Sequence, residues 1–440
     1  MKILLTSLAA RGHAIADALS RSPQNPEIIS VVPARNPGIA ALAAEQFVAD
    51  LMDFSAVLDI AKKTKPDFAF VAPDDPIGAG LVDALEEIGI QSVAPKKNLA
   101  QVEASKGFTR DLLAKHGIDA SPVYRVFTES DATTIRSFLD ELEGNYVVKY
   151  DALKGGKGVK VSDEHVHTID EGVAYAIECI EECGRVVIEE KLIGVEFSLM
   201  SFVSGTTVID MPAVQDHKRA YEGDTGPNTG GMGTYSDANH SLPFLSDNDL
   251  DAAKELNEQT AKALQDECKE PYKGILYGGF IATKKGIQLI EYNARFGDPE
   301  ALNVLPLLES DFVDICQGII SGDLSDDMVS FAKKATVCKY ITPESYPESK
   351  DNRGEKVTLP DAVDDARIYL GDISEKDGNL TLGGSRTAGI VGIGDTIAEA
   401  ETIAQRLCES VEGSVRFRSD IGTKKMIDER IDLIEKVRKG

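Results

Sequence analysis

The segment IEYNARFGDPE carries an acid and an amide two positions apart on a pattern that predicts a β-strand. Because side chains alternate along a strand, Glu291 and Asn293 would point to one face, and Arg295 would follow them. Oxygen donors of this kind suit Mg²⁺, which completes its coordination with phosphate and water oxygens. A planar guanidinium suits a phosphate or a carboxylate. The segment therefore predicts a metal site that handles phosphate, against the alternative of a polar strand with an internal ion pair.

Two earlier segments can serve the rest of a nucleotide. In VVKYDALKGGKGVKV, Lys149 ends a strand pattern, and the glycine-rich turn after it lets backbone N–H groups approach phosphate oxygens. In RVVIEEKLIGVEFS, a strand ends at two acids, where free backbone groups match an adenine edge and Glu196 can accept from ribose hydroxyls. Each segment alone is also compatible with a flexible hairpin tip or a solvated strand end. The candidate ATP-binding residues here are Lys149, Gly155, Gly156, Lys157, Gly158, Glu189, Glu190, Leu192 and Glu196.

A polar, glycine-rich segment, QDHKRAYEGDTGPNTGGMGTYS, joins two apolar stretches at residues 215–236. Such a segment cannot build a core of its own. Its cations, acids and glycines are therefore candidates for binding a charged ligand. A disordered acidic loop is the alternative, but that would require neither GGMG nor the compact run DHKR.

In this order, the three nucleotide and metal segments resemble the ATP-grasp superfamily, in which two α+β lobes close on ATP. The segments 215–236 and IEYNARFGDPE are also similar to signatures of the phosphoribosylamine–glycine ligase family, as are VAPDDPI, VEASKGFTRDLLAKHGI and GSRTAGIVGIGDTIAEAE with VRFRSDIG. The resemblance covers residues 1 to about 425. It implies ATP-dependent ligation of glycine to 5-phosphoribosylamine through glycyl phosphate, in de novo purine biosynthesis. The products would be glycinamide ribonucleotide, ADP and phosphate.

The same resemblance implies roles for individual residues. Glu291 and Asn293 would hold Mg²⁺ or Mn²⁺ between the β- and γ-phosphates of ATP, and Lys106 and Lys149 would contact the α- and β-phosphates. The catalytic residues would be Arg295, Lys218 and Asp216. The implied substrate-binding residues are Arg11, His13, Asn36, Gly38, Asp75, His217, Arg219, Asn228, Thr229, Gly230, Gly231, Gly233, Asp298 and Pro299.

The sequence departs from the family pattern after its first predicted strand. Where the family has GxGGREHA, this chain has SLAARGHA, so Arg11 and His13 keep their places while Leu8, Ala9 and Ala10 replace the glycine-rich run. A glycine loop before a helix is a ready phosphate cradle. The change leaves one alternative open, a related ATP-grasp carboxylate–amine ligase with a different amine acceptor.

The elements that must position these residues follow from the periodicity of the chain. Residues 1–100 alternate short apolar runs with helical patterns, which predicts a parallel α/β domain. We expect an ATP-grasp domain at 101–325, with a flap subdomain at about 122–192, and a small α+β domain at 326–425. A polar terminal helix would span 426–440. The predicted fold class is thus α/β and α+β, in several domains.

Composition limits the partners of this 440-residue chain. Its net charge of −26 argues against a general affinity for nucleic acid or an anionic membrane. No apolar run is long enough to cross a bilayer, and MKILLTSLAA suits a buried strand better than a signal peptide. The six cysteines are scattered, as in a reducing compartment. We expect a cytoplasmic monomer whose partners are the small molecules ATP, glycine and 5-phosphoribosylamine.

Two further classes of protein compete with a ligase. A nucleotide-binding protein without turnover is disfavoured because Lys149, Glu291, Asn293 and Arg295 are all present. The α/β pattern at the N-terminus also suits a dinucleotide-dependent oxidoreductase. No GxGxxG follows the first predicted strand, however, which disfavours that class.

Overall fold

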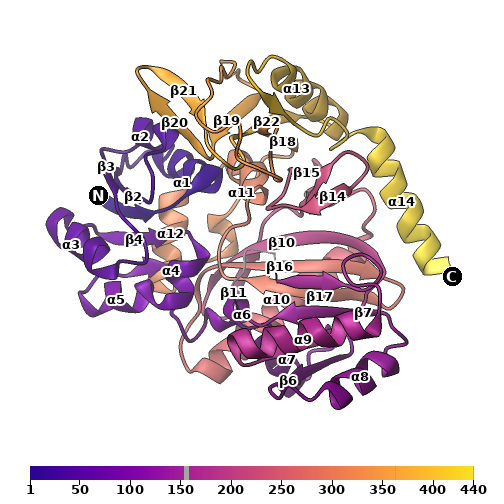
Figure 1. Cartoon of the computed structure of the whole chain (residues 1–440). Helices are drawn as coiled ribbons and strands as arrows, with labels where there is room; N and C mark the ends of the chain where they lie inside the picture. Colours follow the sequence, from indigo (N-terminus) through magenta and orange to yellow (C-terminus); the bar gives the residue numbers. More distant parts are fainter. Residues whose placement is uncertain (153–157, 362, 440) are drawn as a thin grey trace.

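The computed structural model describes residues 1–152, 158–361 and 363–439. Figure 1 shows an N-terminal sheet domain beside a large antiparallel lobe, with a smaller flap lobe below and a C-terminal domain above. The predicted fold class, α/β and α+β in several domains, is confirmed.

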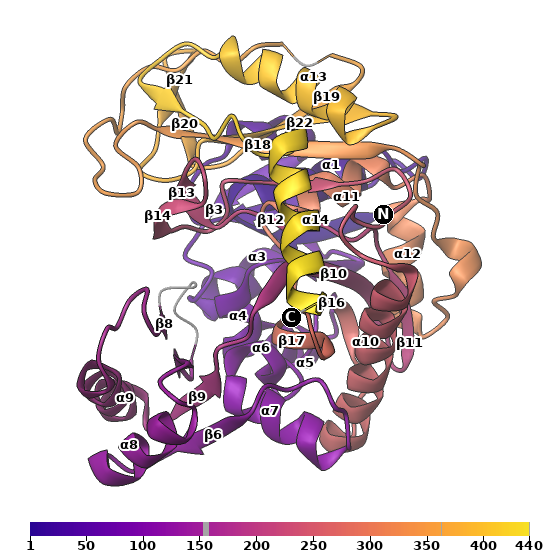
Figure 2. The ribbon, with the colours of Figure 1, turned by 90° about the vertical axis from the view of Figure 1, so that its right-hand side faces the viewer.

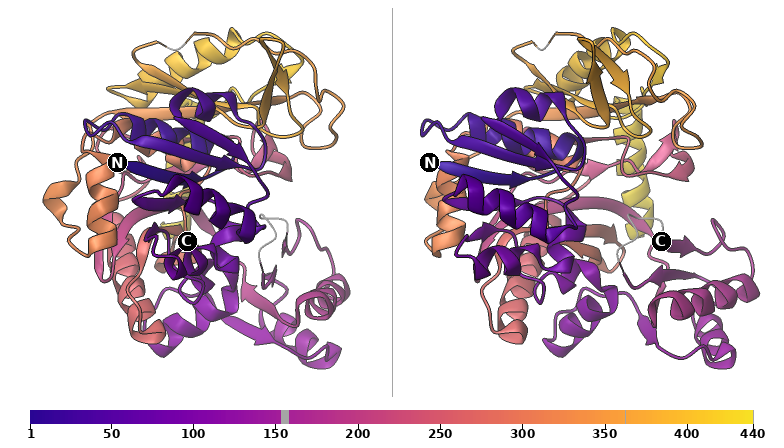
Figure 3. Two further views of the ribbon diagram at one scale, coloured as in Figure 1. Left: turned by 90° about the vertical axis from the view of Figure 1, so that its left-hand side faces the viewer. Right: turned by 60° about the vertical axis from the view of Figure 1, so that its left-hand side comes forward.

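The N-terminal domain is a parallel five-stranded sheet in the order β3-β2-β1-β4-β5, with helices on its faces (Figure 3). Its central strand has the sequence KILLT and is buried, as expected for a parallel sheet covered by helices. The elements are β1 (Lys2–Thr6), α1 (Ala9–Ser20), β2 (Glu27–Val32), α2 (Pro37–Leu42), β3 (Glu45–Val48), α3 (Phe54–Thr64), β4 (Phe68–Val71), α4 (Asp74–Ala79), α5 (Leu81–Glu87) and β5 (Ser92–Val93).

The flap lobe is a four-stranded antiparallel sheet in the order β6-β9-β7-β8, against which α9 packs. Two short helices lead into it. The helical pattern there breaks at Ser105, whose side chain caps the second helix by accepting from the backbone N–H of Phe108. The elements are α6 (Gln101–Ala104), α7 (Lys106–Lys115), β6 (Tyr124–Phe127), α8 (Ala132–Glu141), β7 (Tyr146–Tyr150), β8 (Val159–Val161), α9 (Ile169–Cys183) and β9 (Val186–Glu190).

The large lobe is an antiparallel sheet in the order β11-β10-β16-β17, packed against the long helix α10. A capping box between Ser246 and Asp249 starts that helix. The elements are β10 (Gly194–Ser204), β11 (Thr207–Asp210), α10 (Asp247–Cys268), β16 (Lys273–Thr283), β17 (Gly286–Asn293), α11 (Glu300–Val304), η1 (Leu305–Leu307), α12 (Phe312–Ser321) and η2 (Asp326–Met328).

The segment 215–236 is not a plain loop, because it contains four short strands. The last of them, β15, pairs with β18, so a sheet in the order β12-β15-β18-β22-β19 joins this segment to the C-terminal domain. Gly233 makes the pairing possible, since a Cβ there would lie 2.3 Å from the carbonyl oxygen of Cys338. The four strands are β12 (Gln215–Asp216), β13 (Arg219–Tyr221), β14 (Thr225–Asn228) and β15 (Gly233–Ser236).

In the C-terminal domain, α13 packs on one face of this sheet, against β18 and β22, and the chain continues into the helix α14. Figure 2 shows α14 running from that domain down beside β10 and β16. In the described part of the chain, none of the helices has the length and apolar character needed to cross a membrane. The elements are β18 (Ala335–Pro343), β19 (Ala366–Leu370), β20 (Ile373–Lys376), β21 (Asn379–Leu382), β22 (Ala388–Gly394), α13 (Ile397–Glu409), β23 (Val415–Arg416) and α14 (Lys424–Lys439).

Candidate active site

One cleft of about 800 Å³ lies where the N-terminal domain, the flap lobe, the large lobe and the C-terminal domain meet. Most of the residues that sequence reasoning selected line it, although they come from widely separated segments. Gly155, Gly156 and Lys157 lie outside the described residues. The selected residues that line the cleft are Arg11, Lys106, Lys149, Gly158, Glu189, Glu190, Leu192, Glu196, Asp216, His217, Lys218, Arg219, Asn228, Thr229, Gly230, Glu291, Asn293, Arg295 and Asp298.

The end of β17 forms one wall of the cleft. The register of β17 against β16 shifts between Gly279 and Phe280, so that Ile290 is not paired with any residue of β16. The carbonyl oxygen of Ile290 instead accepts hydrogen bonds from Lys149 Nζ at 3.1 Å and Arg110 Nη2 at 2.9 Å. A bulge beside an active site commonly re-aims side chains in this way.

Glu291 is held as a carboxylate. Burial alone would raise the pKa of Glu291, but Lys218, Lys106 and Lys149 outweigh it and lower the pKa below its usual value. Lys218 is held in its charged form, because the nearby carboxylates of Glu196 and Glu291 outweigh burial and raise its pKa. The cleft therefore gathers several cations around one fixed anion.

Asn293 and Arg295 are already engaged with each other. The guanidinium of Arg295 donates to Asn293 Oδ1 at 3.0 Å and lies 2.9 Å from the carboxylate of Glu103. Among the described residues, no group of three or more His, Cys, Asp and Glu side chains is placed to hold a metal ion. Glu291 and Asn293 thus offer two oxygen donors, which fits a divalent cation completed by phosphate oxygens. A cation bound by both would compete with the hydrogen bond from Arg295.

A buried ionic triad lies at the wall of the cleft. Glu189 lies 2.5 Å from Lys149 Nζ and 2.7 Å from Arg110 Nε, and all three side chains are at most 7% exposed. Although burial opposes ionisation, Arg110 and Lys149 lower the pKa of Glu189 to about 2. The triad fixes the direction of the Lys149 side chain, since its partners come from α7 and β9.

The segment 215–236 forms another wall of the cleft. Burial and the neighbouring carboxylate of Glu300 raise the pKa of Asp216 well above its usual value. Glu300 is itself held by the hydroxyl of Tyr277, which donates to it at 2.8 Å. The imidazole of His217 is buried, which lowers its pKa to about 4 and keeps it neutral. Burial therefore keeps His217 uncharged and disfavours the charged form of Asp216.

Glycines shape the rest of that segment. Gly231 has φ +111°, and a Cβ there would lie 2.7 Å from Asp216 Oδ1 and 2.6 Å from Pro299 Cδ. Gly231, Gly233 and Pro299 are not among the residues that line the cleft. They lie behind it, where Gly231 and Gly233 let the segment approach its neighbours closely.

The structure places four selected residues of the N-terminal domain outside the cleft. His13 Nδ1 accepts from the backbone N–H of Leu370 at 2.9 Å, and burial lowers its pKa to about 4. Asn36 caps α2 and donates to the carbonyl oxygen of Leu370, while Gly38 leaves room for the ring of His13. These three residues join the N-terminal and C-terminal domains. Asp75 is exposed, and its neighbour Asp74 lines the cleft instead.

Sequence reasoning missed several residues that line the cleft. Arg386, from the C-terminal domain, donates to the carbonyl oxygens of Gly230 at 2.8 Å and Asp298 at 3.0 Å. Arg386 lies in GSRTAG, a segment that resembles the family, but the sequence alone indicates no role for this residue. The other missed acids are Asp74, Glu103, Glu164, Asp224 and Glu300. Asp74, Glu103, Asp224 and Glu300 lie within segments selected for their family resemblance, which could have drawn attention to them, whereas Glu164 lies outside these segments.

The replaced glycines leave a physical trace. Ala9 adopts φ +58°, a left-handed conformation that costs a residue with a Cβ about 1–2 kcal/mol. We expect Ala9→Gly to raise the free energy of unfolding by about 0.5–1 kcal/mol, after the greater chain entropy of glycine is subtracted. The helical neighbour Ala10 serves as the control, because Ala10→Gly should lower it by about 1 kcal/mol. Denaturant melts measure both free energies of unfolding. If the two variants changed this free energy in the same direction, the backbone strain assigned to Ala9 would be contradicted.

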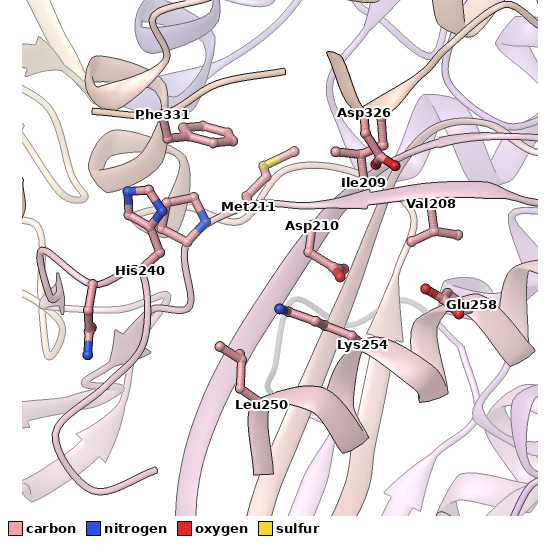
Figure 4. Close-up of a pocket in the computed structure, with 12 residues that line it drawn as sticks. Val208, Ile209, Asp210, Met211, His240, Leu250, Lys254, Glu258, Asp326 and Phe331 are labelled. Atoms are coloured by element: carbon pink, nitrogen blue, oxygen red, sulfur yellow. The ribbon is translucent and has the colours of Figure 1, made fainter. Parts of the chain in front are cut away.

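A second hollow of about 440 Å³ lies apart from the cleft, between β11, α10 and the segment around Phe331. Figure 4 shows Asp210 and Lys254 facing each other across it, with Glu258 to one side and His240 to the other. Asp210 already accepts from the hydroxyl of Ser201 at 2.6 Å. None of the residues selected from the sequence lines this hollow.

Comparison with known proteins agrees with this geometry. The chain matches the family models of phosphoribosylglycinamide synthetase, with its N domain at residues 1–103, its ATP-grasp (A) domain at 104–301 and its C domain at 336–424. It is 46% identical over 438 residues to phosphoribosylamine–glycine ligase of Methanosarcina barkeri and 45% identical over 447 residues to that of Methanococcus maripaludis, with 100% of each chain covered. The crystal structure of phosphoribosylamine–glycine ligase from Thermotoga maritima is similar, with a TM-score of 0.80, 27% identity and coverage of 96% of this chain and 100% of that chain.

Proposed function

Because the chain belongs to the phosphoribosylglycinamide synthetase family along almost its whole length, we propose that the cleft ligates glycine to 5-phosphoribosylamine and splits ATP to ADP and phosphate. The protein is a ligase that forms a C–N bond, as the names of its full-length relatives state. Those relatives favour this pair of substrates over a different amine acceptor, the alternative raised by the replaced glycines before Arg11.

The observation that carries the proposal is the charge arrangement at the end of β17. An ionised Glu291 stands two positions from Asn293, and Lys218, Lys106 and Lys149 are the cations that lower its pKa most. A triphosphate needs cations along its chain and an anionic oxygen ligand for its metal. Three lysines acting on one half-buried carboxylate is not the pattern of an ordinary surface strand.

The reaction requires the protein to align its substrates, and it does not require a nucleophilic side chain. A carboxylate is a poor electrophile, so the γ-phosphate of ATP must first be transferred to glycine. The amine of phosphoribosylamine then attacks glycyl phosphate, and phosphate leaves as the amide forms. Both steps need reactants held in line and negative charge neutralised as it develops.

The nucleotide half of the cleft would be formed by the flap lobe and β17. Lys149, aimed by Glu189 and by the carbonyl oxygen of Ile290, would contact the α- and β-phosphates together with Lys106. The backbone around Leu192, just beyond the end of β9, would meet the adenine edge. The walls of the cleft would exclude water, which would otherwise hydrolyse glycyl phosphate.

Glu291 and Asn293 would hold the divalent cation, which we propose is Mg²⁺ or Mn²⁺. A metal there would supply Lewis-acid neutralisation of the phosphate oxygens. Arg295, released from Asn293 when the cation binds, would be free to approach the transferred phosphate. Glu103 would keep its guanidinium close to the cleft.

The acceptor half would be formed by the segment 215–236 and by two arginines from other domains. Arg11 and Arg386 both line the cleft near Asp298, which accepts from the backbone N–H of Arg11 at 3.2 Å and lies 3.3 Å from Arg386 Nη2. Their guanidinium groups suit the phosphate of phosphoribosylamine. Lys218 would neutralise the carboxylate of glycine.

The proposed function is tested by measuring ADP release. We expect ADP to form when ATP, Mg²⁺, glycine and freshly generated 5-phosphoribosylamine are all present, and to fall to background when any one is omitted. The amide product is identified by mass. ADP release that ignores glycine, or that proceeds equally with other amines in place of the sugar amine, would reject the proposal.

A further inference from the structure

The C-terminal helix α14 reaches the active-site cleft. It lies beyond the family C domain, which is matched at 336–424, and crosses from the C-terminal domain to the large lobe (Figure 2). Two of its side chains, Arg430 and Leu433, line the cleft. The helix is therefore in a position to affect substrates directly or through neighbours.

Two different sets of contacts hold α14. Met426 and Ile434 are 4% exposed, and Ile427, Ile431 and Leu433 pack against the core of the large lobe. Near the end of the helix, Arg438 Nη2 lies 2.6 Å from Asp249, the residue that closes the capping box of α10. These contacts suffice to dock the helix on the lobe.

Arg430 makes a contact of another kind. Its guanidinium forms an ion pair with Asp224, at the turn between β13 and β14, where the backbone is left-handed with φ +53°. The other carboxylate oxygen of Asp224 accepts from the buried Arg418 at 2.8 Å. Burial opposes ionisation, but His217, Arg430 and Arg418 lower the pKa of Asp224 to about 2. The turn is thus pinned from two sides, by the C-terminal domain and by α14.

The pinned hairpin carries the acceptor side of the cleft. Arg219 on β13 pairs with Asn228 on β14, and Lys218 and Thr229 flank the two strands. Thr229 closes the base by donating from its hydroxyl to the carbonyl oxygen of Lys218 at 2.9 Å. Movement of the turn at Asp224 would therefore shift all four of these side chains, which line the cleft.

We propose that α14 is a working part of the active site, in which Arg430 is a positioning residue that holds the β13–β14 hairpin over the acceptor half through Asp224. This inference rests on the proposed function, because it assigns the hairpin to the binding of glycine. The helix holds the β13–β14 hairpin in its binding conformation before glycine binds, which lowers the cost of ordering it. The nucleotide half does not depend on this ion pair.

The test compares Arg430→Gln with Lys425→Gln on the same helix. Lys425 has a side chain that is 87% exposed and an acid, Glu429, no closer than 3.9 Å, so its loss removes the same charge without touching the hairpin. We expect Arg430→Gln to raise the KM for glycine about tenfold, with the KM for ATP changed less than twofold. Arg430→Lys should recover part of the loss. Asp224→Asn, which also removes the charge that faces Arg418, should cost at least as much as Arg430→Gln, and the double variant should be no worse than Asp224→Asn.

Hydrogen exchange gives a readout that does not depend on turnover. Backbone amides of residues 219–228 should exchange faster in Arg430→Gln than in Lys425→Gln, while those of β17 stay unchanged. If the unmodified protein shows no glycine-dependent ADP release, the proposed function fails. If it turns over normally and Arg430→Gln equals Lys425→Gln in both glycine KM and exchange, the role of α14 is rejected. Equal losses for ATP and glycine with a lowered melting temperature would also reject it, because they indicate general destabilisation.

Discussion

Replacing Glu291 by glutamine should lower the rate of glycine-dependent ADP release about 10³-fold. The substitution keeps the size of the side chain but removes the anionic oxygen that we assign to the metal, along with its attraction for three lysines. The Mg²⁺ concentration needed for half-maximal rate should rise as well. Steady-state ADP release, measured across a Mg²⁺ titration, gives both quantities.

A matched control separates the local effect from a general loss of charge. Glu270 pairs with Lys96 at 3.2 Å outside the cleft, and Glu270→Gln should leave the rate and the Mg²⁺ dependence unchanged. Thermal melts of both variants show whether Glu291→Gln is folded. If Glu291→Gln is folded and releases ADP at a near-normal rate, the proposed metal site at the end of β17 is rejected.

Sequence periodicity could predict the long elements of this fold, because their patterns repeat many times. The helix α10 spans 22 residues, and the antiparallel strands β10, β16 and β17 span 11, 11 and 8 residues, so each gives a long run of one kind of pattern. By contrast, α2 and β3 are short and partly exposed, so neither left a periodic signal. The strands within 215–236 were also missed, because β15 is stabilised by pairing with β18, about a hundred residues later in the chain.

The residues of the candidate site also differ in whether local sequence patterns or tertiary packing determine their positions. Glu291 and Asn293 could be placed on one face because strand alternation alone fixes that relation. Arg386 and Glu103 could not, because each reaches the cleft through tertiary packing between domains. His13 and Asn36 show the reverse case. The family resemblance implied that they bind substrate, whereas in the structure they hydrogen-bond the backbone at Leu370.

Family resemblance added roles that periodicity could not supply, but it does not replace local physics. Ala9 keeps the left-handed backbone that a glycine would adopt without strain. The turn at the start of α1 therefore has a backbone conformation that suits glycine, although alanine occupies the position. Arg11, two residues later, still reaches the cleft and donates to the carbonyl oxygen of Phe296 at 2.6 Å.

The largest effect on stability should come from Glu189→Gln. Removing this carboxylate leaves Arg110 and Lys149 buried without their anion, at a cost of about 3–5 kcal/mol in the free energy of unfolding. Burial already lowers the pKa of Lys149, so the lysine can shed its proton, but the guanidinium of Arg110 cannot. Urea melts at neutral pH measure the loss.

The pH dependence gives a second measure of the same interaction. The pKa of Glu189 falls from about 4.5 to about 2 on folding, so its contribution is fully present above the higher value and disappears as the pH falls through the lower one. The shift corresponds to about 3 kcal/mol, in agreement with the cost of breaking the triad. The difference in unfolding free energy between the unmodified protein and Glu189→Gln should therefore narrow steadily from pH 5 towards pH 2.

Glu190 supplies the control for this prediction. It follows Glu189 on β9 and lies 3.5 Å from Lys285, whose side chain is 70% exposed, so Glu190→Gln should cost less than about 0.5 kcal/mol. Its difference from the unmodified protein should also stay constant over the same pH range. If Glu189→Gln behaved like Glu190→Gln, the triad would be contributing little net stability. Lys149 would then be aimed at the cleft by the carbonyl oxygen of Ile290 rather than by charge.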